Sequence, residues 1–188
     1  MILHDQCPLL EELRFMSSFE IEGMPRKWFA AGALCGLRVL EVQEFYFEEG
    51  EEILRGAVTE YRSSMADALV IAIAKGCPQL SVLLLNGLHT GITDKAVRGI
   101  EQFLPRLERL GICGSSITDG GLALIGKKLE SLRELRVQYC TLMTARGVLE
   151  LAAEREDLVV IGQVGPVGYL PNRMCDDDDW CGVCWWAD

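Results

Sequence analysis

The sequence contains little of the chemistry on which most enzymes depend. It has only two histidines, His4 and His89, and neither lies at a recognisable spacing from a serine or cysteine nucleophile. It also lacks a glycine-rich phosphate-binding loop, a zinc-protease helix and a paired-carboxylate motif. We therefore expect a non-catalytic protein that uses no cofactor.

Basic residues are in the minority, with 18 Lys and Arg against 28 Asp and Glu, and the formal net charge is -10. Such a chain repels phosphate groups, so we expect neither nucleic acid nor an anionic membrane surface as its main partner. Its longest apolar run, Ala68 to Ala74, is far shorter than the roughly 20 residues that span a bilayer. The first seven residues contain no basic segment leading into a long apolar one, which argues against a secretory signal. We expect no membrane insertion and a cytoplasmic or nuclear location.

Cysteine, by contrast, is abundant. Three of the eight cysteines cluster near the C-terminus and the other five lie singly, at Cys7, Cys35, Cys77, Cys113 and Cys140. Single cysteines in apolar surroundings usually act as small buried hydrophobic residues. We therefore predict that these five are buried free thiols in a reducing compartment.

One pattern recurs along the chain: a leucine, two residues, a second large aliphatic residue, one residue and a third apolar residue. Its copies begin at Leu10, Leu37, Leu80, Leu107, Leu132 and Leu158. Four of the five intervals are 25 to 27 residues and the remaining one is 43. The last copy is degraded and consists of Leu158 and Ile161. We predict a strand at each copy.

A second motif follows the strands. Ile92-Thr93-Asp94 and Ile117-Thr118-Asp119 match each other, and Met143-Thr144-Ala145 is a weaker copy. Threonine or aspartate before residues with helical apolar spacing is typical of a helix N-cap. Strand and helix therefore alternate, and stacked units bury their apolar faces between a concave parallel sheet and convex helices. The predicted fold class is an α/β solenoid of about six repeats.

These two motifs together resemble the cysteine-containing class of leucine-rich repeats over roughly residues 7 to 162. The family includes F-box substrate receptors of ubiquitin ligases and small AMN-type repeat proteins, some of which are mitochondrial assembly factors. The resemblance implies a module that binds protein partners, with substrate recognition in a ubiquitin ligase as one role. The alternative is a small structural subunit or assembly factor of a large complex, with a mitochondrial location. The family often has cysteine or asparagine in the turn after each strand. In this chain only Cys140 fits that position, whereas Leu88 and Ser115 occupy the equivalent positions in the two preceding turns. We therefore expect the ladder of hydrogen bonds from turn side chains to the backbone to be incomplete.

We divide the chain into a solenoid, residues 1–162, and an irregular tail, residues 163–188. The solenoid contains an insertion near 44–65, within which Ile53 to Tyr61 is compatible with a short helix. The aromatic and acidic side chains of the insertion indicate either a solvated loop that packs back on the solenoid or a contact arm. No polar capping unit precedes the first predicted strand, so we expect either that the chain is a C-terminal piece of a longer protein or that something else covers this end.

The concave face is the first predicted interaction surface. Side chains between the core leucines point to this face because they alternate along each strand. An apolar centre surrounded by charge resembles the anatomy of a protein interface. The partner-binding candidates here are Arg14, Glu41, Val82, Leu84, Arg136 and Gln138. The alternative is that Val82 and Leu84 extend a hydrophobic strand or are covered by the loop or tail.

The tail is the second candidate region. Four consecutive aspartates, Asp176 to Asp179, precede Trp180, Trp185 and Trp186. Tryptophan is a common interface anchor, so we expect these three side chains to dock on this chain or on a partner. Trp180 to Cys184 resembles the W-C-G-x-C segment of thioredoxins, but only four residues follow, too few for the helix that activates the thiol.

The cysteines of the tail leave two further alternatives. Cys181 and Cys184 could form a labile disulfide with each other. Together with Cys175 and an aspartate, they could instead bind zinc. Structural zinc sites usually use two separated pairs of ligands and this tail offers one pair, so we expect no metal site.

Overall fold

The computed structural model describes residues 9–17, 29, 34–44, 59–86, 91–164 and 168–169. Six strands form one parallel sheet in sequence order, and four helices accompany them in this part of the chain. The strands are β1 (Glu12–Ser17), β2 (Val39–Glu44), β3 (Val82–Asn86), β4 (Arg109–Ile112), β5 (Glu134–Arg136) and β6 (Val159–Ile161). The helices are α2 (Thr59–Gly76), α3 (Asp94–Phe103), α4 (Asp119–Lys128) and α5 (Ala145–Glu154). The predicted α/β class is confirmed.

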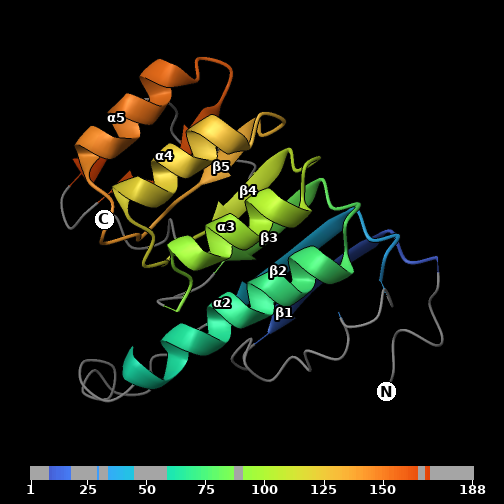
Figure 1. Cartoon of the computed structure of the whole chain (residues 1–188). Coiled ribbons are helices and arrows are strands. Elements are labelled where there is room, and N and C mark those ends of the chain that lie inside the picture. The colour runs from blue at the N-terminus through green and yellow to red at the C-terminus, as the bar shows by residue number, and fades with distance from the viewer. Residues whose placement is uncertain are drawn as a thin grey trace.

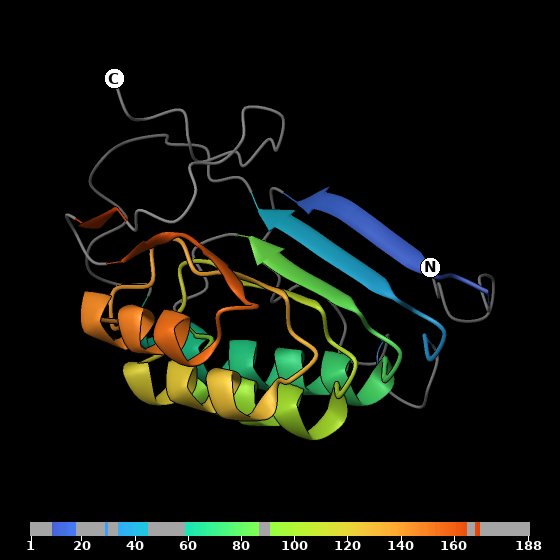
Figure 2. The ribbon, with the colours of Figure 1, turned by 90° about the horizontal axis from the view of Figure 1, so that it is seen from above.

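The molecule has two layers, with the four helices side by side along one face of the sheet (Figure 1). The view from above separates the strands from the helices and shows each unit following the one before it, a solenoid-like arrangement (Figure 2). The core lies between the layers. Its fully buried members come from strands and helices alike, among them Leu40, Leu83 and Leu135 on strands and Ile100 on α3.

Threonines begin three of the helices, as predicted. Thr93, Thr118 and Thr144 are the N-caps of α3, α4 and α5, and all three have extended backbone angles. Each hydroxyl accepts a hydrogen bond from a backbone N–H in the first turn of its own helix. These bonds satisfy donors that a helix N-terminus otherwise leaves unpaired.

Aspartates link each helix start to the next, a feature that sequence reasoning missed. The Asp94 carboxylate accepts from the backbone N–H of Thr118 at 2.9 Å and from its hydroxyl at 2.7 Å. Asp67 accepts the same pair of bonds from Thr93, and Asp119 accepts them from Thr144. We call these contacts the Asp–Thr ladder. It ends with Ala145, which stands where the earlier units have the aspartate.

The first helix of this series differs from the others at its start. Asp67 lies within α2, eight residues after the helix begins at Thr59, whereas Asp94 and Asp119 are the first residues of their helices. Part of the predicted insertion is therefore an N-terminal extension of α2. The predicted helix from Ile53 to Tyr61 is correct for its last three residues, but the helix continues to Gly76; residues 45–58 lie outside the described residues.

The predicted register of the last strand, β6, is wrong by one residue. Val160, and not Ile161, pairs with the core residue Leu135, while Ile161 pairs with Arg136. Only one residue separates Leu158 from Val160, whereas two separate the first two leucines of the preceding copies. A shift of one residue exchanges the two faces of a strand, so Val160 is buried and Ile161 lies on the opposite face.

Beyond β6, the structure differs from the predicted irregular linker. The short strands β7 (Gln163–Val164) and β8 (Gly168–Tyr169) pair in antiparallel fashion. None of the helices in the described part of the chain is long and apolar enough to cross a membrane.

The cysteines agree with the prediction in three places and contradict it in one. Cys77, Cys113 and Cys140 are buried free thiols, but Cys35 is exposed. Cys35 lies in the turn before β2, beside the buried Leu34 and Leu37, so the apolar neighbours are inside while the thiol is outside. Burial and the nearby Cys35 raise the pKa of Cys77 to about 12, which keeps that thiol protonated. Cys7 lies outside the described residues.

Candidate interaction surface

The sheet face opposite the helices, which we call the outer sheet face, carries two rows of side chains in strict register. The strand pairing defines the first row as Glu12, Val39, Val82, Arg109, Glu134 and Val159. The second row is Arg14, Glu41, Leu84, Gly111, Arg136 and Ile161. Alternation along each strand therefore places Arg14, Glu41, Val82, Leu84 and Arg136 on one surface, as the sequence predicted.

One charged cluster lies on β1 and β2. Arg14 pairs with Glu12 on its own strand at 3.3 Å and with Glu41 on the neighbouring strand at 3.5 Å. We call these three residues the N-terminal cluster; with two glutamates and one arginine its formal charge is negative. The Arg14 side chain is 60% exposed, so these pairs contribute little to stability and remain accessible to another molecule.

A second cluster, on β4 and β5, has the opposite balance. Glu134 accepts two hydrogen bonds from Arg109, at 3.0 and 3.2 Å, and a third from Nε of Arg136 at 2.6 Å. We call Arg109, Glu134 and Arg136 the C-terminal cluster; two arginines and one glutamate make it formally positive. Burial alone would raise the pKa of Glu134, but the hydrogen bonds from Arg109 and Arg136 outweigh that effect and lower it.

Apolar side chains separate the two clusters. Val39 and Val82 pair directly and are both partly exposed. Leu84 was predicted to be an exposed contact, but it is buried, with only 3% of its surface exposed. Its neighbour Gly111 has no side chain, and a methyl group at Gly111 would lie 3.0 Å from a Leu84 methyl carbon. The Leu84 side chain therefore packs against Gly111 and is a buried part of the outer sheet face.

The C-terminal ends of the strands carry a polar row. The Cys113 thiol donates to the Asn86 side chain at 3.6 Å and lies 3.8 Å from the side-chain oxygen of Gln138. Gln138 thus joins the surface at the end of β5. In the turns beyond, Ser115 and Cys140 are in contact at 3.1 Å, and Cys140 also donates to the Ile112 carbonyl. Ser115 was expected to interrupt the ladder of turn side chains, but it contacts Cys140 instead; Leu88 lies outside the described residues.

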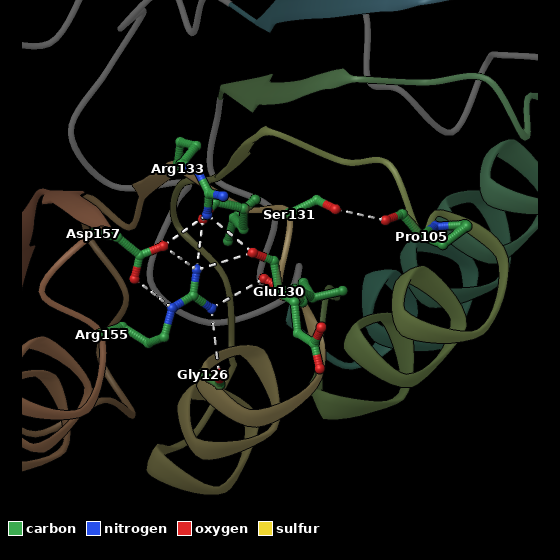
Figure 3. Close-up of polar contacts among 9 residues, drawn as sticks. Pro105, Gly126, Glu130, Ser131, Arg133, Arg155 and Asp157 are labelled. Atoms are coloured by element: carbon green, nitrogen blue, oxygen red, sulfur yellow. Dashed lines mark hydrogen bonds and ion pairs between the residues drawn. The ribbon is translucent and has the colours of Figure 1, made fainter.

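A separate polar group lies away from this surface, at the C-terminal end of α4 (Figure 3). The Arg155 guanidinium donates to carbonyl oxygens at Gly126, Leu129, Glu130 and Leu132 and forms an ion pair with Asp157. Arg155 is the C-cap of α5, the position that buried leucines occupy in α3 and α4. Its contacts satisfy helix-end carbonyls, so we assign it to stability.

Sequence reasoning named Arg136 as a partner-binding candidate but did not name Glu134, its ion-pair partner, or Arg109, which also pairs with Glu134. Arg109 and Glu134 are 25 residues apart, which is the repeat interval itself. Opposite charges at that spacing were the available signal for neighbouring strands. The tail candidates Trp180, Trp185, Trp186, Cys175, Cys181 and Cys184 lie outside the described residues.

No known protein family model matches the chain. The chain is similar to a curated protein of the fungus Eremothecium gossypii, the antagonist of mitotic exit network protein 1, with 31% identity over 129 residues. The matched segment is 64% of this chain and 32% of that relative, so the similarity spans about a third of the relative's length.

Proposed function

We propose that this chain is a non-catalytic, leucine-rich-repeat protein-interaction module whose outer sheet face binds a protein partner. The observation that carries the proposal is the pair of oppositely charged clusters held in register on either side of a partly exposed apolar centre. An apolar centre with a charged rim is the usual organisation of a protein interface. The similarity to a protein named as an antagonist in the mitotic exit network adds support for a regulatory binding role.

We further propose which kind of partner the outer sheet face binds. We assign to the module the capture of a regulatory protein in the cytoplasm or nucleus, where the reducing environment suits its buried free thiols. Substrate recognition in a ubiquitin ligase is the more specific form of this role. It rests on the resemblance of the leucine and Ile-Thr-Asp motifs to those of F-box receptors.

A second candidate function, a subunit of a larger assembly, is favoured by one observation. Most of the exposed large apolar residues in the described part of the chain lie near its C-terminal end. They are Tyr139, Leu142, Leu149 and Val159. Exposed apolar residues in the last unit of a stack, such as Leu149 on α5, are typical of assembly contacts. Leu149→Glu should release the chain from a large assembly, as sedimentation would show, but should leave capture through the outer sheet face intact.

The experiment is a comparative capture. The full chain, Val82→Glu and Glu41→Arg are immobilised in parallel with Arg98→Glu, a control on the exposed side of α3. Proteins that bind the wild-type chain and the control, but neither outer-face variant, identify specific partners. Circular dichroism checks that each variant is folded. Partners retained by both outer-face variants would refute the proposal.

A further inference from the structure

The first row of the outer sheet face changes in charge from one strand to the next. From β1 to β4 its residues are Glu12, Val39, Val82 and Arg109, and none of the four is buried. We propose that this row binds an extended protein segment with a basic residue, an apolar residue two positions away and an oxygen acceptor two positions beyond that. The inference rests on the proposed function, because it names the chemistry of the partner that the same surface binds.

Glu12 and Glu41 attract the basic residue of the segment. Each uses one carboxylate oxygen to pair with Arg14, and the described part of the chain provides no partner for the other oxygen. Their side chains are 58% and 30% exposed, so a cation from another molecule reaches them. Two carboxylates beside one guanidinium attract that cation at close range. The net charge of -10 also favours the approach of a basic segment from a distance.

Val39 and Val82 select the apolar residue. They lie opposite each other in the strand register and are both partly exposed. The Leu84 side chain next to them is buried and apolar, so it offers no hydrogen bond. A polar side chain placed here would lose water without gaining a hydrogen-bond partner. An apolar side chain instead covers both valines.

Arg109 selects the oxygen acceptor. Its Nε and Nη2 donate to Glu134 at 3.0 and 3.2 Å, whereas its Nη1 has no partner among the described residues. The Arg109 side chain is 40% exposed, so Nη1 is accessible. Because Glu134 already shares the charge of this arginine, a side-chain amide oxygen is sufficient and a carboxylate is not required. A lysine at the same position would meet a guanidinium, which disfavours segments that are basic throughout.

The spacing of these contacts matches an extended segment that crosses the strands. From Glu12 on β1 to Arg109 on β4 is three strand spacings, or about 14 Å. Four extended residues cover about 13–14 Å. Side chains alternate along an extended segment, so the first, third and fifth face the sheet. The third then lies about 7 Å along the row, between the two valines. A helix advances only about 6 Å over four residues and cannot make the same contacts.

Selection from a phage library of random nonapeptides, with the full chain immobilised, tests this chemistry. The wild-type chain is compared with Glu12→Arg, which reverses one charge of the row. The matched control is Glu156→Arg, the same substitution in the exposed turn between α5 and β6. Wild type and control should enrich peptides with lysine or arginine two positions from an apolar residue, by about tenfold or more over the unselected library. Glu12→Arg should instead enrich aspartate or glutamate at that position.

Two further measurements make the selection quantitative. By fluorescence polarisation, a peptide selected on the wild type should bind Glu12→Arg about tenfold more weakly, and changing its basic residue to glutamate should restore binding to that variant. Val82→Glu should remove the preference for an apolar residue. Circular dichroism checks that each variant is folded.

Three results would each overturn the inference. They are no enrichment of a basic residue two positions from an apolar one, the same charge preference for the wild type and Glu12→Arg, and a reversed preference for Glu156→Arg. The capture experiment on the proposed function uses whole proteins and does not depend on the peptide pattern. Failure of the selection with capture intact would therefore refute this partner chemistry alone, whereas partners retained by both outer-face variants would refute the proposed function.

Discussion

Replacing Arg155 with alanine should lower the free energy of unfolding by about 2–4 kcal/mol, a large effect for a residue outside the apolar core. The arginine reaches the last turn of α4 from the end of α5, and its side chain is only 13% exposed. Its shortest bond to a carbonyl, at Leu132, is 2.8 Å long. Hydrogen bonds from a charged donor each contribute about 1.5–3 kcal/mol, and a cation at a helix C-terminus adds about 0.3–1 kcal/mol. The four bonds share one cation and are not additive, and water reaches the freed carbonyls in the variant, so the expected loss is near that of one or two such bonds.

Urea denaturation followed by circular dichroism measures the change. The control is Arg146→Ala, because Arg146 forms an ion pair with Glu150 but is 86% exposed; its loss should leave the free energy of unfolding almost unchanged. Arg155→Lys should be intermediate, since one ammonium group cannot bridge carbonyls spread around the helix end. A loss below about 1 kcal/mol for Arg155→Ala, or equal losses for the alanine variants at 155 and 146, would refute this account of the helix end.

Three further outcomes are expected. Asp94→Ala should destabilise the fold by roughly 2–3 kcal/mol and speed hydrogen exchange at the Thr118 amide; unchanged exchange there would contradict the Asp–Thr ladder. The Asp157 carboxyl, hydrogen-bonded to its arginine partner, has its pKa lowered from 3.8 to about 2. Its stabilising effect is therefore present above about pH 4 and is lost as the pH falls towards 2. Asp157→Asn should remove this part of the loss of stability in acid. A pKa near 3.8 for the Asp157 carboxyl, measured by NMR titration, would disprove the pairing. Native-state thiol labelling at pH 8 should modify Cys35 rapidly and Cys77 only on unfolding, because burial raises the pKa of Cys77 to about 12; equal rates would contradict its burial.

The fold was predictable because its leucine pattern returns at 25 to 27 residues in all but one interval. Leu40, Leu83, Leu110 and Leu135 are aligned by the leucine spacing alone, and the structure pairs them in that register. Thr93, Thr118 and Thr144 were recognisable as caps because capping depends on local sequence. The last strand was assigned to the wrong face, because the interval alone did not reveal that its copy is one residue shorter.

The candidate surface was predictable only in part. The alternation of side chains along each strand predicted which residues share the outer sheet face, but it did not predict how exposed each side chain is. Leu84 is buried, and its neighbour Gly111 leaves room for the leucine side chain. That packing depends on two residues 27 positions apart, and no local pattern encodes it. Asp67 was missed for a similar reason: it follows Ala66 inside a helix, without the threonine that marks the later units.

The same interval specifies both the stability of the sheet and the charge pattern of its outer face. Asp94 reaches Thr118 only if α3 and α4 start at equivalent heights, and that same alignment places Arg109 beside Glu134. A slip of one residue between these units would break the polar bonds at the helix starts, turn core leucines outward and separate the ion pairs at once. The two charged clusters therefore cannot be rearranged without unfolding the sheet beneath them. A partner meets a surface whose charges are fixed before binding, so little ordering free energy is lost on contact.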